Sequence, residues 1–358
     1  MPRLQMSLYA LPVQDHVSGR GPIIRPVSSI DVARLAGVSQ SAVSRTFAPD
    51  GSVSARTREK VLAAAATLGY RPNRIPAIML SGRSHMVGVI VGGLDNPFYA
   101  TVLDRFAVAL RDIGLHVLLV QVADSLALDA ALDQLAGYRV DAAVTALAVG
   151  TRQAADALSA LRIPIVCFNS RLTSPWISTV RSDNRAAGRD AADLLADRGV
   201  RRPAWMAGPP ANAASRERGR GFTEQLAARG LAPAATMRGS DTYQGGYDAI
   251  RHLLSASPPP DGLFCSNDLM ACGAIDALRQ VGGLSVPADV RVVGYDDIPQ
   301  AAWHSYDLTS FDQQVDRMVA AALDLLATAL AGPPGPAGGR TLNIPTRLVE
   351  RGSTRHGG

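Results

Sequence analysis

"IDVARLAGVSQSAVSRTF" (Ile30–Phe47) decides the fold of the first part of the chain. Its first half has the pattern of a short helix, which one of the two preceding serines caps and Gly37 ends. Ser39 then caps a second helix that runs to Phe47, because a serine oxygen accepts hydrogen bonds from the free N–H groups of a helix start. Two helices joined by a short turn that contains glycine indicate a helix-turn-helix.

A third helix follows this pair. Ser54 is its expected N-cap, and Gly69 closes it after an alanine-rich stretch. In the first helix, we expect Ile30, Ala33 and Leu35 to point inward and form the small core with the other two helices.

The second helix carries side chains suited to reading DNA. Gln40 and Ser41 stand at its start, and Ser44 and Arg45 lie one turn later. Glutamine reads adenine and arginine reads guanine through paired hydrogen bonds, whereas serine contacts bases or phosphates. Taken alone, this pattern leaves open an exposed polar helix of an all-α cap.

Charge is distributed unevenly along the 358 residues. The whole chain has a formal net charge of +5, but the segment from Met1 to Ser84 holds 11 Lys and Arg against 4 Asp and Glu. That segment therefore has a net charge of +7, and the remainder has −2. A basic module joined to a near-neutral one favours a polyanionic partner at the N-terminal end.

The pattern changes after a connector rich in proline. From residue 85 onward, short apolar strands alternate with amphipathic helices, which predicts doubly wound parallel sheets, and the number of units predicts two of them. The expected domains are an arm over 1–27 that we take as disordered, a helix-turn-helix domain over 28–72, a hinge over 73–84 and an effector-binding and dimerisation domain over 85–355.

Several function classes lack their sequence signals. The N-terminus shows no signal peptide and the chain no apolar run of about 18 residues, so we expect a cytoplasmic protein. The three cysteines have no disulfide or zinc spacing and are expected to be buried thiols. No nucleophile constellation, metal-ligand pair or phosphate loop occurs, so we expect no enzyme activity, no cofactor and no metal.

The segment from Ser28 to Asn73 closely resembles the DNA-binding headpiece of the LacI/GalR family of bacterial transcription regulators. The resemblance continues to about Thr354 through motifs such as "GRSHMVGVIVGGLDNPFY", "ASRERGRGF", "FCSNDLMACGAIDALR", "VPADVRVVGYDDIP" and "LVERGST". It implies an all-α helix-turn-helix headpiece with a hinge helix, followed by an α/β effector domain like a periplasmic binding protein, with two doubly wound parallel-sheet lobes and a ligand cleft between them.

The resemblance also implies the site residues. In the headpiece and hinge, those expected to contact DNA are Ser39, Gln40, Ser41, Ser44, Arg45, Asn73, Arg74 and Met79, the last as an apolar wedge in the minor groove. In the effector domain, those expected to line the pocket are Asn96, Phe98, Asn169, Arg216, Asp241, Asn267, Asp296 and Gln313.

Two of these positions depart from the pattern of the family. Asn169 stands where relatives often carry aspartate, and Asp241 stands near the place where many carry an aromatic that stacks on a sugar.

The function implied is a ligand-responsive regulator that binds operator DNA sequence-specifically, with repression as the expected mode and a sugar or sugar acid as the expected effector. Its expected partners are operator DNA, this effector and a second copy of the chain, and no membrane. The C-terminus has no leucine heptads, so we expect dimers. The alternative function is a metabolite-binding protein without operator-specific DNA binding.

Overall fold

The computed structural model describes residues 27–48, 51–72, 83–92, 94–122, 125–145, 152–171, 173–332, 335–336 and 338–355. The chain separates into two compact units, residues 1–80 and 81–358. The predicted hinge contacts Asn73, Arg74 and Met79 lie outside the described residues, and so does the predicted arm apart from Val27. Within the described ranges, no helix is long and apolar enough to cross a membrane.

The described residues of the first unit form three short helices, α1 (Ser29–Ala36), α2 (Gln40–Phe47) and α3 (Ala55–Leu68). Ser28 is the N-cap of α1 and forms a capping box with Asp31, and Gly37 ends the helix with a φ of 65°. The side chain of Ser39 accepts a hydrogen bond from the backbone of Ala42 at 3.2 Å. These contacts confirm the predicted helix-turn-helix.

The core of this unit differs from the prediction in one helix. Val32 and Ala33 of α1 pack with Val43 and Val61. Ile30 and Leu35 were expected to point inward, but they are 52% and 54% exposed, so that prediction was wrong. The buried positions of α1 lie around Val32 and Ala33, and Ile30 and Leu35 fall outside that narrow face of an eight-residue helix.

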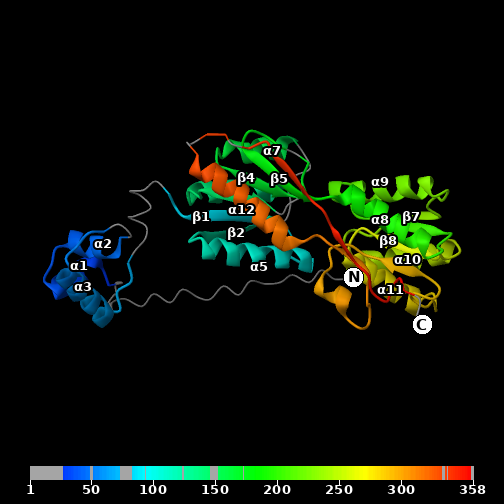
Figure 1. The fold of residues 1–358 in the computed structure, drawn as a ribbon, viewed down its shortest axis with the longest axis horizontal. Helices are drawn as coiled ribbons and strands as arrows, with labels where there is room; N and C mark the ends of the chain where they lie inside the picture. Colours follow the sequence, from blue (N-terminus) through cyan, green and yellow to red (C-terminus); the bar gives the residue numbers. More distant parts are fainter. Residues whose placement is uncertain are drawn as a thin grey trace, which may run out of the picture. The chain divides into compact units, whose positions relative to one another are not determined.

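The second unit begins with a lobe built on a parallel sheet (Figure 1). Among the described residues the sheet has six strands in the order β11-β5-β4-β3-β1-β2. They are β1 (Met86–Val91), β2 (His116–Gln121), β3 (Ala142–Thr145), β4 (Ile165–Phe168), β5 (Ile177–Ser182) and β11 (Thr341–Ile344). The helices of this lobe are α5 (Pro97–Asp112), α6 (Ser125–Gly137), α7 (Arg152–Ala160) and α12 (Val315–Ala331).

Each face of this sheet has its own core. Alternate strand residues such as Val166 and Phe168 pack against α5 and α12. Their neighbours Ile165 and Cys167 pack against α6 and α7 on the other side. This alternation follows from the two-residue period of a strand whose two faces are both covered.

The other lobe repeats this arrangement with fewer strands. Its parallel sheet has the order β7-β6-β8-β9 in the described residues. The strands are β6 (Pro203–Ala207), β7 (Ala235–Arg238), β8 (Gly262–Cys265) and β9 (Arg291–Val293). The helices are α8 (Asn184–Asp197), α9 (Ala213–Ala228), α10 (Tyr243–Ala256), α11 (Asp268–Gln280) and the 3₁₀ turn η1 (Pro299–Ala302). Trp205 and Phe264 pack toward α8 and α9, whereas Met206 and Cys265 pack toward α10 and α11.

Among the described residues, three segments connect the two lobes. The first runs from β5 to α8, the second from β10 (Ser310–Asp312) to α12, and the third from β11 to β12 (Arg347–Val349). β10 and β12 pair antiparallel, so the second and third segments lie side by side; the third is the red strand in Figure 1. The predicted fold class, a helical headpiece followed by two parallel-sheet lobes, is confirmed, and the three cysteines are buried and free as expected.

Candidate nucleic-acid interface and effector cleft

The helix α2 has a buried face and an exposed face. Ala42, Val43 and Thr46 are buried against the other two helices. The five predicted DNA contacts of this segment are all exposed: Ser39, Gln40, Ser41, Ser44 and Arg45. Their spacing puts them on one side of the helix, because residues one turn apart share a face.

In the part of the chain that the structure describes, the long side chains of this face make weak or exposed contacts. The Arg45 Nε donates to the Ser41 carbonyl at 3.4 Å, and the Gln40 amide donates to the Ser29 hydroxyl at 3.0 Å. Base edges and phosphates offer stronger acceptors than these exposed groups. The exposed face of α2 is therefore arranged as a recognition helix would be.

In the second unit, polar side chains from both lobes meet at Asp296. The Gln313 amide donates to the Asp296 carboxylate at 2.7 Å, and Asn96 donates to its other oxygen at 3.3 Å. Asn169 donates to the Gln313 carbonyl oxygen at 3.0 Å, and the Ser182 hydroxyl donates to the same oxygen. Four of the residues predicted for the pocket thus form one hydrogen-bonded network.

Burial raises the pKa of Asp296 to about 6, even though Arg218 and the two amides favour its charged form. Tyr99 on α5 lies in the same electrostatic environment. Its pKa is raised to about 12, first by burial and then by the charges of Asp296 and Asp241. Tyr99, which the sequence analysis did not single out, therefore feels the charge of both carboxylates.

The arginine of the cleft is Arg218 and not Arg216, which corrects the sequence prediction. Arg218 is only 5% exposed; its Nε donates to Asn184 at 2.7 Å, and Nη1 donates to the Ser266 carbonyl. Its guanidinium lies 3.4 Å from the centroid of the Tyr295 ring. Arg216 is exposed, with its guanidinium on the carbonyl of Pro210. Residues two apart on a helix point to nearly opposite sides, so only one of this pair can face inward.

Asn267 and Asp241 lie together at the strand ends of the second lobe. Asn267 is the N-cap of α11, accepting from Met270 N at 2.9 Å, and it donates to the Asp241 carbonyl at 3.1 Å. The Asp241 carboxylate accepts from the Asn212 amide at 2.9 Å, and burial raises the pKa of Asp241. Both side chains are thus held by neighbours in the loops that follow the strands, where ligands of parallel sheets bind.

Two cavities open beside the connections between the lobes. One, of about 330 Å³, is lined by Phe98, Asp296 and residues of the second and third connections. The other, of about 230 Å³, is lined by Asn169, Asn184 and the start of α9. The larger falls within the range of about 300–1,000 Å³ that is usual for small-molecule sites. Phe98 itself lines this cavity but is mostly buried in the core of the first lobe.

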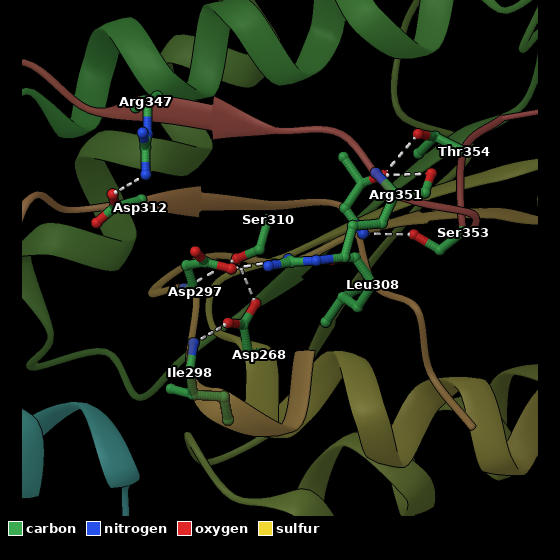
Figure 2. A network of polar contacts seen from close by, with 11 residues as sticks. Asp268, Asp297, Ile298, Leu308, Ser310, Asp312, Arg347, Arg351, Ser353 and Thr354 are labelled. Carbon is green, nitrogen blue, oxygen red and sulfur yellow. Dashed lines mark hydrogen bonds and ion pairs between the residues drawn. The ribbon is translucent and has the colours of Figure 1, made fainter. Parts of the chain in front are cut away.

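Asp268 is a fully buried carboxylate that the sequence analysis also missed. It accepts hydrogen bonds from the Ser310 hydroxyl at 2.6 Å and from the Ile298 backbone at 2.9 Å (Figure 2). Burial and the nearby charge of Asp296 raise its pKa from 3.8 to about 7.

Asp268→Asn is expected to flatten the dependence of stability on pH. The folded chain keeps a proton on Asp268 at a pH where the unfolded chain has lost it, so this group favours folding at low pH. That contribution disappears as the pH rises from about 4 to about 7. Between pH 5 and pH 7.5, thermal unfolding should show the wild-type Tm falling by a few degrees relative to the variant. Asp104→Asn, at a side chain that is 66% exposed, serves as the control. Parallel profiles for wild type and Asp268→Asn would contradict the expectation.

Comparison with known proteins places these two units in a family. Residues 30–73 match the family described as bacterial regulatory proteins, lacI family, and residues 192–354 match the periplasmic binding protein-like domain. The chain is 34% identical over 310 residues to the HTH-type transcriptional regulator CelR of Thermobifida fusca. These aligned residues make up 84% of this chain and 91% of CelR. The chain belongs to the lacI family. It is a DNA-binding transcription regulator by that membership, and the predicted family is confirmed.

Other members of the lacI family agree over most of the chain. The ribose operon repressor of Escherichia coli K12 is 32% identical over 90% of this chain and 98% of its own length. The lac repressor dimer bound to operator and the anti-inducer ONPF superposes with a TM-score of 0.81 at 28% identity, over 92% of this chain and 99% of that one. The complex of CelR with cellobiose gives a TM-score of 0.69 at 33% identity, over 92% of this chain and 100% of that one.

The residues missed by the sequence analysis had only weak signals. Arg218 stands in "SRERGR", where three arginines alternate with other residues. The composition of this stretch does not show which of the three faces the interior. A helical projection that set Arg218 beside the small Gly221 and the apolar Phe222 would have favoured it, because both of these are buried. Tyr99 follows Phe98 in an amphipathic helix. The neighbouring residues therefore do not distinguish Tyr99 from a tyrosine that only packs in the core.

Proposed function

We propose that this lacI-family protein is a cytoplasmic repressor whose affinity for operator DNA is set by a sugar-like effector in the cleft around Asp296. The observation that carries the proposal is the exposed face of α2, where Gln40, Ser41, Ser44 and Arg45 lie together with no acidic residue among them. This face supports direct reading of base edges in the major groove, with Ser39 and Ser44 supporting backbone contacts.

The chemistry of the cleft favours a small polyhydroxylated effector. Amides, carboxylates and one buried guanidinium converge there: Asn96, Asn169, Asn267, Gln313, Asp241, Asp296 and Arg218. Such a set both donates and accepts, as vicinal hydroxyl groups require. Cellobiose bound to CelR is a ligand of this kind in a relative. Arg218 replaces Arg216 as the proposed effector contact, and Tyr99 joins the set.

The two lobes supply a way for the effector to act. Asn96 belongs to the first lobe and Asp296 to the second, so the hydrogen bond between them reports lobe closure. An effector that binds either the open or the closed arrangement of the lobes more tightly shifts the population toward that arrangement. If the headpieces bind DNA in only one of the two arrangements, this shift changes the operator affinity. We propose no catalytic activity and no cofactor for the protein.

A homodimer is the proposed assembly. The lac repressor structure that superposes on this chain is a dimer on operator DNA. On the second lobe, Trp303 is 55% exposed and stacks on Tyr306, and the hydroxyls of Tyr306 and the exposed Tyr243 both donate to Asp276. Exposed aromatic side chains of this kind are typical of interfaces between subunits.

The test combines operator binding and ligand binding. A gel shift at about 150 mM salt with the DNA upstream of its own coding sequence should show sequence-specific retardation. A thermal-shift screen with cellobiose, D-glucose, D-ribose, D-gluconate and adenosine should show stabilisation by a sugar, because a ligand that binds only the folded state raises Tm by mass action. Stabilisation without any specific retardation would favour the alternative, a metabolite-binding protein that does not recognise an operator.

A further inference from the structure

The loop that presents Asp296 to the cleft has an unusual backbone. Asp296 has a φ of 115° and Asp297 a φ of 52°, both in regions that residues with a side chain rarely adopt. Such conformations cost free energy and persist only where surrounding contacts hold them. The position of the Asp296 carboxylate therefore depends on what clamps this two-residue turn.

One clamp comes from the second lobe and the second connection. The Asp297 backbone donates to the Ser310 hydroxyl at 3.1 Å, and that hydroxyl donates to Asp268 at 2.6 Å. Asp268 also accepts from the Ile298 backbone at 2.9 Å, directly after the turn. A side chain at Gly294 would overlap the Asp268 carboxylate, so glycine there permits this approach. Figure 2 shows Asp268 and Ser310 meeting at the turn.

The other clamp is the C-terminal segment Glu350–Thr354. The Arg351 guanidinium forms an ion pair with Asp297 at 2.7 Å, and the two side chains are only 18% and 19% exposed. Arg351 also donates to the Leu308 carbonyl at 2.8 Å, and its own backbone bonds with Thr309. Figure 2 shows the guanidinium reaching from this segment to Asp297. A partly buried pair is screened less than a pair on the surface, so it can help to hold a strained turn.

We propose that Arg351 is a positioning residue for effector binding, which acts through Asp297 to hold the strained turn that directs Asp296 into the cleft. The inference rests on the proposed function, because it takes Asp296 to be an effector contact. Among the described residues, the Arg351 side chain reaches Asp297 and the Leu308 carbonyl and none of the four network residues Asn96, Asn169, Asp296 and Gln313. Its contribution is to keep Asp296 where Gln313 and Asn96 meet it.

The experiment measures by calorimetry the affinity for whichever of cellobiose, D-glucose or D-ribose stabilises the wild type. Arg351→Gln and Asp297→Asn are each expected to weaken that affinity about tenfold, because the turn is no longer held. The double variant should be no weaker than either single variant, since both changes break the same pair. Arg351→Lys should restore most of the affinity. A merely structural role of the Arg351–Asp297 pair would lower the Tm of these variants but leave the sugar affinity of the folded protein unchanged.

The matched control is Arg198→Gln. It breaks the ion pair of 2.6 Å between Arg198 and Glu350, the residue that precedes Arg351, and leaves the pair between Arg351 and Asp297 in place. It should leave the affinity within about twofold of the wild type. Equal affinities for Arg351→Gln and Arg198→Gln would overturn the positioning role. Asp296→Asn separates the two proposals: if it binds the sugar as the wild type does, the proposed effector site itself is wrong. If Arg351→Gln does not fold, Asp297→Asn and Arg351→Lys decide the question.

Discussion

Replacing Arg45 by alanine is expected to lower the specific operator affinity by at least about tenfold while affinity for unrelated DNA changes little. Arg45 is exposed on the outer face of α2, and its Nε donates to the Ser41 carbonyl at 3.4 Å. A bidentate contact from arginine to guanine contributes about 1–3 kcal/mol of discrimination, and it is lost in each half-site of a dimer. Nonspecific affinity comes mainly from the summed positive charge, from which one charge is removed.

Arg34→Ala is the control for this prediction. Arg34 is also a mostly exposed arginine of the headpiece, paired with Asp31 on α1 and not on α2. Gel shifts with operator and with scrambled DNA, at one salt concentration, give the ratio of the two affinities for each variant. If Arg34→Ala and Arg45→Ala reduce that ratio equally, α2 does not choose the sequence. Sugar binding should be unaffected by either change.

Arg218→Lys is expected to shift the response to the effector to about tenfold higher concentration or more, while the protein still binds its operator. Lysine keeps the charge, but it cannot donate to both Asn184 and Ser266 while lying flat on the Tyr295 ring. Hydrogen bonds to a charged group contribute about 1.5–3 kcal/mol each, so the loss of one should weaken effector binding about tenfold or more. The measurement is operator release against the concentration of the stabilising sugar.

Arg216→Lys provides a matched control two positions earlier on the same helix. It is the same chemical change at an exposed side chain, and it should leave the response as in the wild type. The opposite result would be loss of the response in Arg216→Lys and its retention in Arg218→Lys. It would support Arg216 as the effector contact, as the sequence analysis predicted. Circular dichroism before each titration checks that both variants are folded.

Most of the headpiece was predictable because its signals are local. The caps Ser39 and Ser54 and the helix end at Gly37 lie within a few residues of the groups they satisfy, so the limits of α2 came out as expected. The error at Ile30 and Leu35 shows the limit of that reasoning. A helix of eight residues has too few turns for apolar spacing to show which side meets α3.

In the effector domain, the sequence by itself determined the two-lobed parallel fold and, by resemblance, most of the polar residues of the cleft. Alternating apolar strands and the order of the motifs depend on composition and spacing, which are local properties. Only the tertiary structure decided which arginine faces Asp296, that Tyr99 shares its environment, and that Arg351 reaches Asp297. These contacts join residues far apart in the chain, and burial in a shared cleft sets their charge and geometry. No single segment contains that information.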